Sequence, residues 1–186
     1  MMEQIMFEVK KALEFKGRVL IAIDGRAGAG KSTLAKELAE LLDGEIISMD
    51  DFFLPMELRT EERLKEPGGN VHYERFAREV GLKLVYAMPF EYGVFDCSEM
   101  KIASKKHIKN GRIVIVEGSY SLRPEFRDLY DIRIFMDVEP DVQMKRITER
   151  NGKEMARRFK DLWIPMEEKY FEKCGVKECA DIVLKR

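Results

Sequence analysis

The chain has little that would indicate a disulfide scaffold or a nucleic-acid-binding protein. Cysteine is scarce, and Cys97, Cys174 and Cys179 are odd in number and lack the spacing of redox or zinc motifs. This usage indicates free thiols in a reducing compartment. The 33 Lys and Arg residues nearly cancel the 34 Asp and Glu residues. No overall basic field therefore favours a nucleic-acid partner.

Long hydrophobic runs are missing as well. The longest apolar runs are too short to span a bilayer. The first 17 residues read as a short amphipathic helix with acidic positions, which is not the pattern of a signal peptide. We therefore expect a cytoplasmic protein with no membrane partner. A homo-oligomer is compatible with the sequence.

Five apolar stretches predict strands, at 18–24, 44–49, 112–118, 131–138 and 180–185. Helical spacing alternates with them, at 31–43, 73–87, 140–150 and 154–172. This alternation predicts an α/β fold in which helices cover both faces of a parallel sheet. The length fits a single domain over 1–186. The interval 50–111 is too long for a simple crossover, so we expect it to build an acceptor site; the alternative is a decorated surface loop.

Residues 25–32, GRAGAGKS, fit the spacing G-x-x-x-x-G-K-[ST] between a predicted strand and a predicted helix. Such glycines let backbone amides curl around phosphate oxygens, and the helix directs its positive end to the same point. Lys31 is expected to reach the β- and γ-phosphates of ATP, and the Ser32 hydroxyl to bind Mg²⁺. The predicted nucleotide-binding residues are consecutive: Gly25, Arg26, Ala27, Gly28, Ala29, Gly30, Lys31, Ser32 and Thr33.

Two neighbouring aspartates follow the second predicted strand, in SMDDFF. A carboxylate at this strand end can take a proton from an acceptor hydroxyl, although Asp is also common in caps and turns. We favour Asp50 as the base, with Asp51 as the alternative. Phe53 is expected to wall the acceptor pocket.

Two further features point to phosphoryl transfer. The apolar strand IVIVEG ends in Glu117, where a carboxylate can hold Mg²⁺ together with Ser32 and Asp50. Arg146 and Arg150 lie four apart on one helical face, and guanidinium groups stabilise a transferring phosphoryl group. We expect residues 146–158 to form a lid, a segment that also contains Arg157 and Arg158. The alternative is a solvated charged helix face.

The segments GRAGAGKST, SMDDFF, VHYERF, PFEYGVFD, IVIVEGSYSL and RRFKDLWIPMEEKYF occur in an order that resembles the uridine kinase-like branch of the phosphoribulokinase/uridine kinase family. The resemblance covers the chain from about residue 18. It implies a P-loop kinase sheet with strand order 2-3-1-4-5 and transfer of the γ-phosphoryl group of ATP to the 5′-hydroxyl of a nucleoside.

The resemblance also implies roles for individual residues. Asp50 matches the family's proton acceptor, Glu117 the acid of the third strand, and Arg146 and Arg150 the lid arginines. Asp96 matches an aspartate near the acceptor pocket, where Phe95 replaces a tyrosine. With His72, the predicted acceptor-site residues are Asp51, Phe53, His72, Phe95 and Asp96.

One departure bears on the acceptor. Val71 and His72 stand where uridine–cytidine kinases carry a ribose-binding aspartate, and a histidine cannot chelate a diol as a carboxylate does. A kinase of another small metabolite is therefore an alternative, as is a non-catalytic ATP-dependent binding or switch protein. The chain lacks the guanine-reading N-K-x-D of GTP switches.

Overall fold

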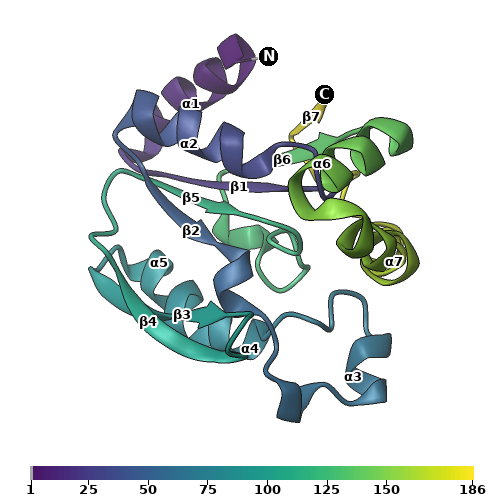
Figure 1. Cartoon of the computed structure of the whole chain (residues 1–186). Coiled ribbons are helices and arrows are strands. Elements are labelled where there is room, and N and C mark those ends of the chain that lie inside the picture. Colours follow the sequence, from purple (N-terminus) through teal and green to yellow (C-terminus); the bar gives the residue numbers. More distant parts are fainter. Residues whose placement is uncertain (1) are drawn as a thin grey trace.

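The apolar stretches form one parallel sheet at the centre of the chain. The computed structural model describes residues 2–186, and Figure 1 shows the sheet between two layers of helices. The sheet order is β2-β5-β1-β6-β7. The five strands are β1 (Val19–Gly25), β2 (Glu45–Ser48), β5 (Ile113–Glu117), β6 (Ile132–Asp137) and β7 (Ile182–Lys185). Counted among these five, the order is 2-3-1-4-5, which confirms the predicted topology.

The central strand explains why its sequence is almost continuously apolar. β1 pairs in parallel with β5 on one side and with β6 on the other, and every one of its seven residues is buried. A strand that is covered on both faces and flanked on both edges meets no water, so alternation of polar and apolar residues is not needed. Its carboxyl end therefore opens from the middle of the sheet, where ligands of α/β proteins usually bind.

Two helices cover one face of the sheet. α1 (Met2–Lys16) and α2 (Lys31–Leu42) bury Ile5, Val9, Leu34 and Leu38 against this face. The amphipathic pattern predicted for the first residues is thus used to cover the sheet. Among residues 2–186, no helix combines the length and the apolarity that crossing a bilayer requires.

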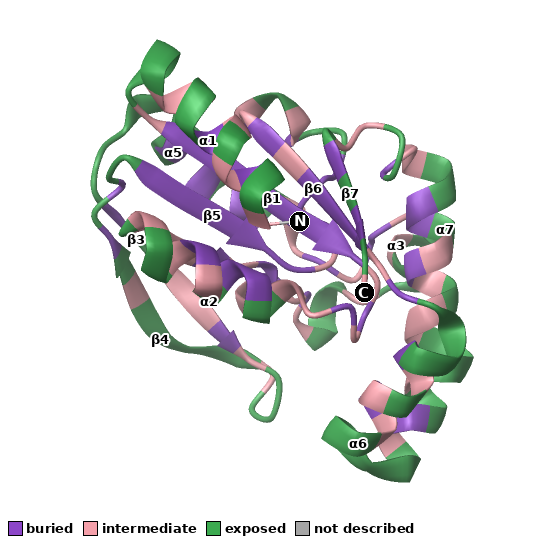
Figure 2. Ribbon diagram, turned by 90° about the horizontal axis from the view of Figure 1, so that it is seen from above, coloured by how far each residue is buried: buried purple, intermediate pink, exposed green. Residues whose placement is uncertain are grey.

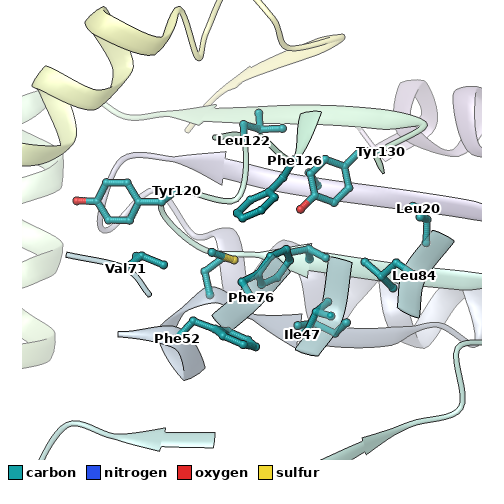
Figure 3. Close-up of a cluster of buried hydrophobic side chains, with 14 of the residues drawn as sticks. Leu20, Ile47, Phe52, Val71, Phe76, Leu84, Tyr120, Leu122, Phe126 and Tyr130 are labelled. Atoms are coloured by element: carbon teal, nitrogen blue, oxygen red, sulfur yellow. The ribbon is translucent and has the colours of Figure 1, made fainter. Parts of the chain in front are cut away.

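The long interval after β2 covers the opposite face. It contains η1 (Met49–Phe52), η2 (Met56–Leu58), α3 (Glu61–Lys65), α4 (Tyr73–Phe76), the π-helical turn η3 (Ala77–Gly81), α5 (Leu82–Tyr86) and a hairpin of β3 (Phe90–Asp96) with β4 (Lys101–Ile108). The helix expected over 73–87 is present with this π-helical turn in its middle. Phe52, Phe76 and Phe126 meet in the core cluster that packs on this face of the sheet (Figure 3).

The hairpin was not predicted from the sequence. In β4 only Ile108 is buried, so the strand has no apolar alternation that a sequence pattern could detect. β3 supplies the packing instead, since Tyr92 stacks on Phe52 with ring centroids 5.2 Å apart.

The last third of the chain forms two connected helices and the edge strand. α6 (Pro140–Arg158) is interrupted at Gly152, whose φ of 80° and ψ of 166° are not helical. A π-helical turn, η5 (Phe159–Trp163), leads into α7 (Ile164–Cys174). The two helical segments predicted on either side of Gly152 are therefore confirmed. Figure 2 shows that the outer part of α6 is mostly exposed.

The connection from β5 to β6 contains the short helix η4 (Arg127–Leu129). The segment before it, 118–126, runs close to the carboxyl end of β1, because the Gly118 amide donates to the Ile23 carbonyl at 3.0 Å. This segment takes part in the site described below.

Candidate active site

The glycine-rich loop leaves β1 in a conformation that requires glycine. Gly25 has a φ of 132°, and a Cβ atom placed there would lie 2.1 Å from the Met136 carbonyl oxygen of β6. Gly30 has a φ of 93° and caps the start of α2 without a side-chain hydrogen bond. The first amides of α2 are thus left free at the mouth of the loop, where an anion can accept hydrogen bonds from them.

Lys31 lies against the loop that it follows. Its Nζ donates to the carbonyl oxygens of Gly25 at 2.7 Å and Arg26 at 3.0 Å, and to Ser119 Oγ at 3.3 Å. The ammonium group is therefore held inside the curve of the loop by neutral acceptors. Such contacts can be exchanged for the stronger charge-assisted bonds of a phosphate group.

Glu117 and Ser32 meet at the end of β5. Glu117 Oε2 accepts from Ser32 Oγ at 3.1 Å, and its Oε1 accepts from Ser48 Oγ at 3.0 Å. Burial raises the pKa of Glu117 above its ordinary value, and the negative charge of Asp50 raises it further. The two predicted magnesium ligands, Ser32 and Glu117, are therefore in contact, with Asp50 close enough to act on Glu117 electrostatically.

These donors fit Mg²⁺ in type. All are hard oxygen atoms, and Mg²⁺ in nucleotide sites usually takes one or two carboxylates, with water and phosphate oxygens completing its shell. Within residues 2–186 no group of three or more His, Cys, Asp or Glu side chains could hold a metal ion. Ser32 and Glu117 are therefore oxygen donors of a type that fits this ion.

The structure distinguishes the two neighbouring aspartates. Asp51 Oδ2 accepts from the Tyr92 hydroxyl at 2.8 Å, and its carbonyl oxygen accepts from Arg75. Asp51 thus holds the hairpin. The side chain of Asp50 is exposed to solvent, yet desolvation by nearby protein atoms raises its pKa, an effect that the charges of Lys31 and Arg150 oppose.

The predicted lid arginines lie beside the loop. Arg146 Nη1 donates to the Gly28 carbonyl at 3.1 Å, and Arg150 acts on Asp50 through its charge. Both line a cavity of about 300 Å³ at the mouth of the loop. Arg157 and Arg158 are exposed on α6. The residues lining the cavity are Gly28, Ala29, Gly30, Thr33, Arg146, Arg150 and Arg186.

Arg186 was missed by the sequence analysis. Arg186 directly follows β7. This strand pairs with β6, which in turn pairs with β1, so the end of β7 lies near the loop that follows β1. The predicted strand order could have indicated Arg186, because the carboxyl ends of parallel strands lie at the same edge of a sheet.

The residues predicted to bind the acceptor have differing surroundings. Phe53 pairs with Val71 through an isolated bridge, and Phe95 is buried. His72 caps α4, with Nδ1 3.4 Å from the Arg75 amide and 3.1 Å from Glu74 Oε2. Nδ1 of the imidazole is therefore already used locally.

Asp96 also has local partners. Its Oδ1 accepts from the Ser98 amide at 2.7 Å, the Ser98 hydroxyl at 2.5 Å and the Glu99 amide at 3.2 Å. These bonds close the turn of the hairpin and lower the pKa of Asp96.

A buried carboxylate beneath the loop was not predicted either. Asp24, fully buried at the end of β1, accepts from the Gly25 and Tyr120 amides through Oδ1 at 2.7 and 3.2 Å. Its Oδ2 accepts from the Leu122 amide at 2.9 Å and the Tyr170 hydroxyl at 2.8 Å. Asp24 thus fixes the loop to the segment after β5 and to α7. The sequence feature that could have indicated this role is an aspartate within an otherwise apolar strand.

Together these features define the class of the protein. A glycine-rich loop at the centre of a 2-3-1-4-5 sheet encloses Lys31, a carboxylate–hydroxyl pair lies at the end of the adjacent strand, and arginines of a following helix lie over the loop. This is the arrangement of a P-loop kinase.

Comparison with known proteins identifies the family. No family model matches the chain. The uridine kinase of Clostridium tetani is 31% identical over an alignment of 189 positions, gaps included, which covers 91% of this chain and 87% of that protein. The uridine kinase of Ligilactobacillus salivarius is 28% identical, with 89% and 84% covered. The chain belongs to the uridine kinase family and is a nucleoside kinase-like phosphotransferase.

A solved structure supports the fold independently. The structure of a possible uridine kinase from Bacillus stearothermophilus matches with a TM-score of 0.70 at 18% identity, covering 97% of this chain and 99% of that one. At this identity the likeness establishes the P-loop kinase fold, in agreement with the sheet order.

Proposed function

We propose that the protein transfers the γ-phosphoryl group of ATP to the 5′-hydroxyl of a nucleoside, with uridine and cytidine as the first candidates. The observation that carries this proposal is the position of Asp50. Its side chain is exposed, and the charges of Lys31 and Arg150 act on its carboxylate. A carboxylate so placed can accept the proton of a hydroxyl that attacks a phosphoryl group bound at the loop.

The other residues then take complementary roles. The amides of the loop and of the first turn of α2 hold phosphate oxygens, and Lys31 exchanges its carbonyl partners for the β- and γ-phosphates. Arg146 and Arg150 stabilise the charge that spreads over the transferring group. We propose 146–158 as a lid that excludes water by moving about Gly152, where the helix is already broken.

Ser32, Glu117 and Asp50 are the residues that would hold Mg²⁺. When bound, the ion would neutralise charge on the phosphate oxygens. The bonds from Ser32 and Ser48 already fix the orientation of the Glu117 carboxylate, which keeps its oxygens at the end of the sheet.

The acceptor side leaves room for a second candidate function. Asp51, Phe53, His72, Phe95 and Asp96 remain the proposed acceptor-site residues. However, His72 uses Nδ1 to cap α4 and Asp96 uses Oδ1 to close a turn, so one polar atom of each side chain is held by local contacts. Val71 and His72 also stand where a ribose-binding carboxylate would be expected, which favours, as the alternative, another small alcohol as acceptor within the same chemistry.

The test is acceptor-dependent ADP formation with Mg²⁺ and ATP across a panel of nucleosides and small polyols. Asp50→Asn should lower kcat by about 10² to 10⁴-fold, the usual contribution of a general base, while ATP binding persists. Asp43→Asn is the matched control, because Asp43 is exposed beyond α2 with a φ of 49°, a conformation that Asn tolerates.

Two results would contradict the proposal. Full turnover in Asp50→Asn would remove Asp50 as the base. ATP binding without phosphorylation of any acceptor in the panel would favour a non-catalytic switch.

A further inference from the structure

The helix that follows the lid is attached to the first residues of the phosphate loop. Three residues of α7 make these contacts. The Tyr170 hydroxyl donates to Asp24 at 2.8 Å, Glu168 forms an ion pair with Arg26, and Glu167 accepts from the Ala27 amide at 3.0 Å. The position of α7 and the shape of the loop are therefore linked.

Glu167 differs from the other two residues, because its carboxylate is buried and forms no ion pair among the described residues. The residue is 5% exposed, and none of the ion pairs found over residues 2–186 includes it. Burying a carboxylate without an ion pair is costly unless hydrogen bonds offset the loss of water. Both carboxylate oxygens of Glu167 accept such hydrogen bonds, since Oε2 accepts from the Ala27 amide and Oε1 accepts from the Ser119 hydroxyl at 2.6 Å.

Ser119 connects this carboxylate to Lys31. Because the Ser119 proton is directed to Glu167, the lone pairs of Ser119 Oγ are free to accept from Lys31 Nζ at 3.3 Å. The competing bond from Ser119 to the Gly25 carbonyl is long, at 3.5 Å. The result is a chain of donors and acceptors that runs from Lys31 through Ser119 to Glu167 and ends at the Ala27 amide.

We propose that Glu167 is a positioning residue for the transfer step, which acts through Ser119 to hold Lys31 and through Ala27 to hold the loop. This inference rests on the proposed function, because Lys31 must be placed on phosphate groups for its position to matter. It also makes the position of Lys31 depend on the docking of α7, the helix that continues from the lid.

The charge of Glu167 has an opposing effect on ATP itself. A carboxylate near the loop repels phosphate groups, and at short range inside a protein this repulsion is comparable with a hydrogen bond. Neutralising it should therefore not weaken ATP binding, while the loss of positioning should slow the transfer. A fall in kcat without a rise in the dissociation constant of ATP is the signature of this role.

The test uses Glu167→Gln, Ser119→Ala and the double variant, with Glu172→Gln as the control because Glu172 is exposed on the same helix. Ser119 and Ala27 donate to different oxygens of Glu167, so a glutamine would place an NH2 donor against one of these two donors. Calorimetry with Mg²⁺ and ATP gives the number of binding sites and the dissociation constant. Turnover of saturating uridine is then expressed per ATP-binding site, which removes any contribution from unfolded protein.

Glu167→Gln should lower kcat per site by about 10- to 100-fold, the range expected when a catalytic group is displaced by a fraction of an ångström to an ångström. The dissociation constant of ATP should stay within about threefold, and Glu172→Gln should match the wild type. Since Glu167 acts through Ser119, the double variant should be little slower than the slower single variant.

Wild-type kcat per site in Glu167→Gln would overturn the proposal, as would single effects that multiply in the double variant. A purely structural role would lower the number of ATP sites and leave kcat per site unchanged. If the wild-type protein itself gave no turnover with uridine, the proposed function would fail, and this inference with it. That result is distinct from an active wild type with an equally active Glu167→Gln.

Discussion

Asp24 makes the stability of the protein depend on pH in a direction opposite to that of most carboxylates. Burial raises its pKa from 3.8 to about 6, although the Leu122 and Gly25 amides, the charge of Lys31 and the Tyr170 hydroxyl oppose this change. The folded protein therefore keeps a proton on Asp24 over a range of pH in which the unfolded chain has released it.

The sign follows from linkage. Where the folded state binds more protons than the unfolded state, the free energy of unfolding falls as pH rises. The contribution of Asp24 is thus complete below about pH 4 and lost above about pH 6. A pKa difference of about two units between the folded and unfolded states corresponds to about 3 kcal/mol in the free energy of unfolding, at 1.36 kcal/mol per unit.

The perturbation is Asp24→Asn, which removes the titration. Urea unfolding of both proteins from about pH 4 to about pH 7 gives the free energy of unfolding at each pH. As pH rises across this window, the free energy of unfolding of the wild type should fall by about 2 to 3 kcal/mol relative to that of the variant. Asp43→Asn is the control at an exposed position. A difference that stays constant with pH would refute the assignment of a raised pKa to Asp24.

Three further predictions follow from the site. Gly25→Ala should lower the free energy of unfolding by about 2 to 5 kcal/mol, because a Cβ would meet the Met136 carbonyl and the φ is unfavourable; denaturant unfolding at wild-type stability would contradict this. Glu117→Gln should raise the Mg²⁺ concentration for half-maximal activity by about tenfold, and an unchanged Mg²⁺ titration would exclude Glu117. The kcat of the wild type should fall on the acid side at a pH above the ordinary Asp value of 3.8, because Asp50 must be ionised and desolvation by nearby protein atoms raises its pKa; a fall at or below that value would contradict the role of Asp50.

The sheet could be predicted from the sequence because its strands are buried on both faces. Continuous apolar runs such as Val19–Gly25 are detectable without knowledge of their neighbours. The break at Gly152 was equally visible, since the helical pattern stops on one side of a glycine and resumes on the other. The hairpin was not, because β4 exposes most of its residues and owes its place to the packing of β3.

The candidate site divides in the same way. Local sequence patterns that phosphate chemistry requires contain the loop, Glu117, and the pair Arg146 and Arg150. The sequence alone is therefore enough to propose these residues. Glu167 and Arg186 carry no such pattern, since each reaches the loop only because distant segments fold beside it. The choice between Asp50 and Asp51 also depended on tertiary contact, because only the structure shows Tyr92 bound to Asp51.

The most direct test of the central claim is phosphorus NMR of a mixture of the protein, Mg²⁺, ATP and uridine. The resonance of a nucleoside 5′-monophosphate should grow with that of ADP in the wild type and in Asp43→Asn, and should be absent in Asp50→Asn over the same period. ATP that persists unchanged beside wild-type protein and every nucleoside tried, or a 5′-monophosphate that forms equally fast in Asp50→Asn, would contradict the account.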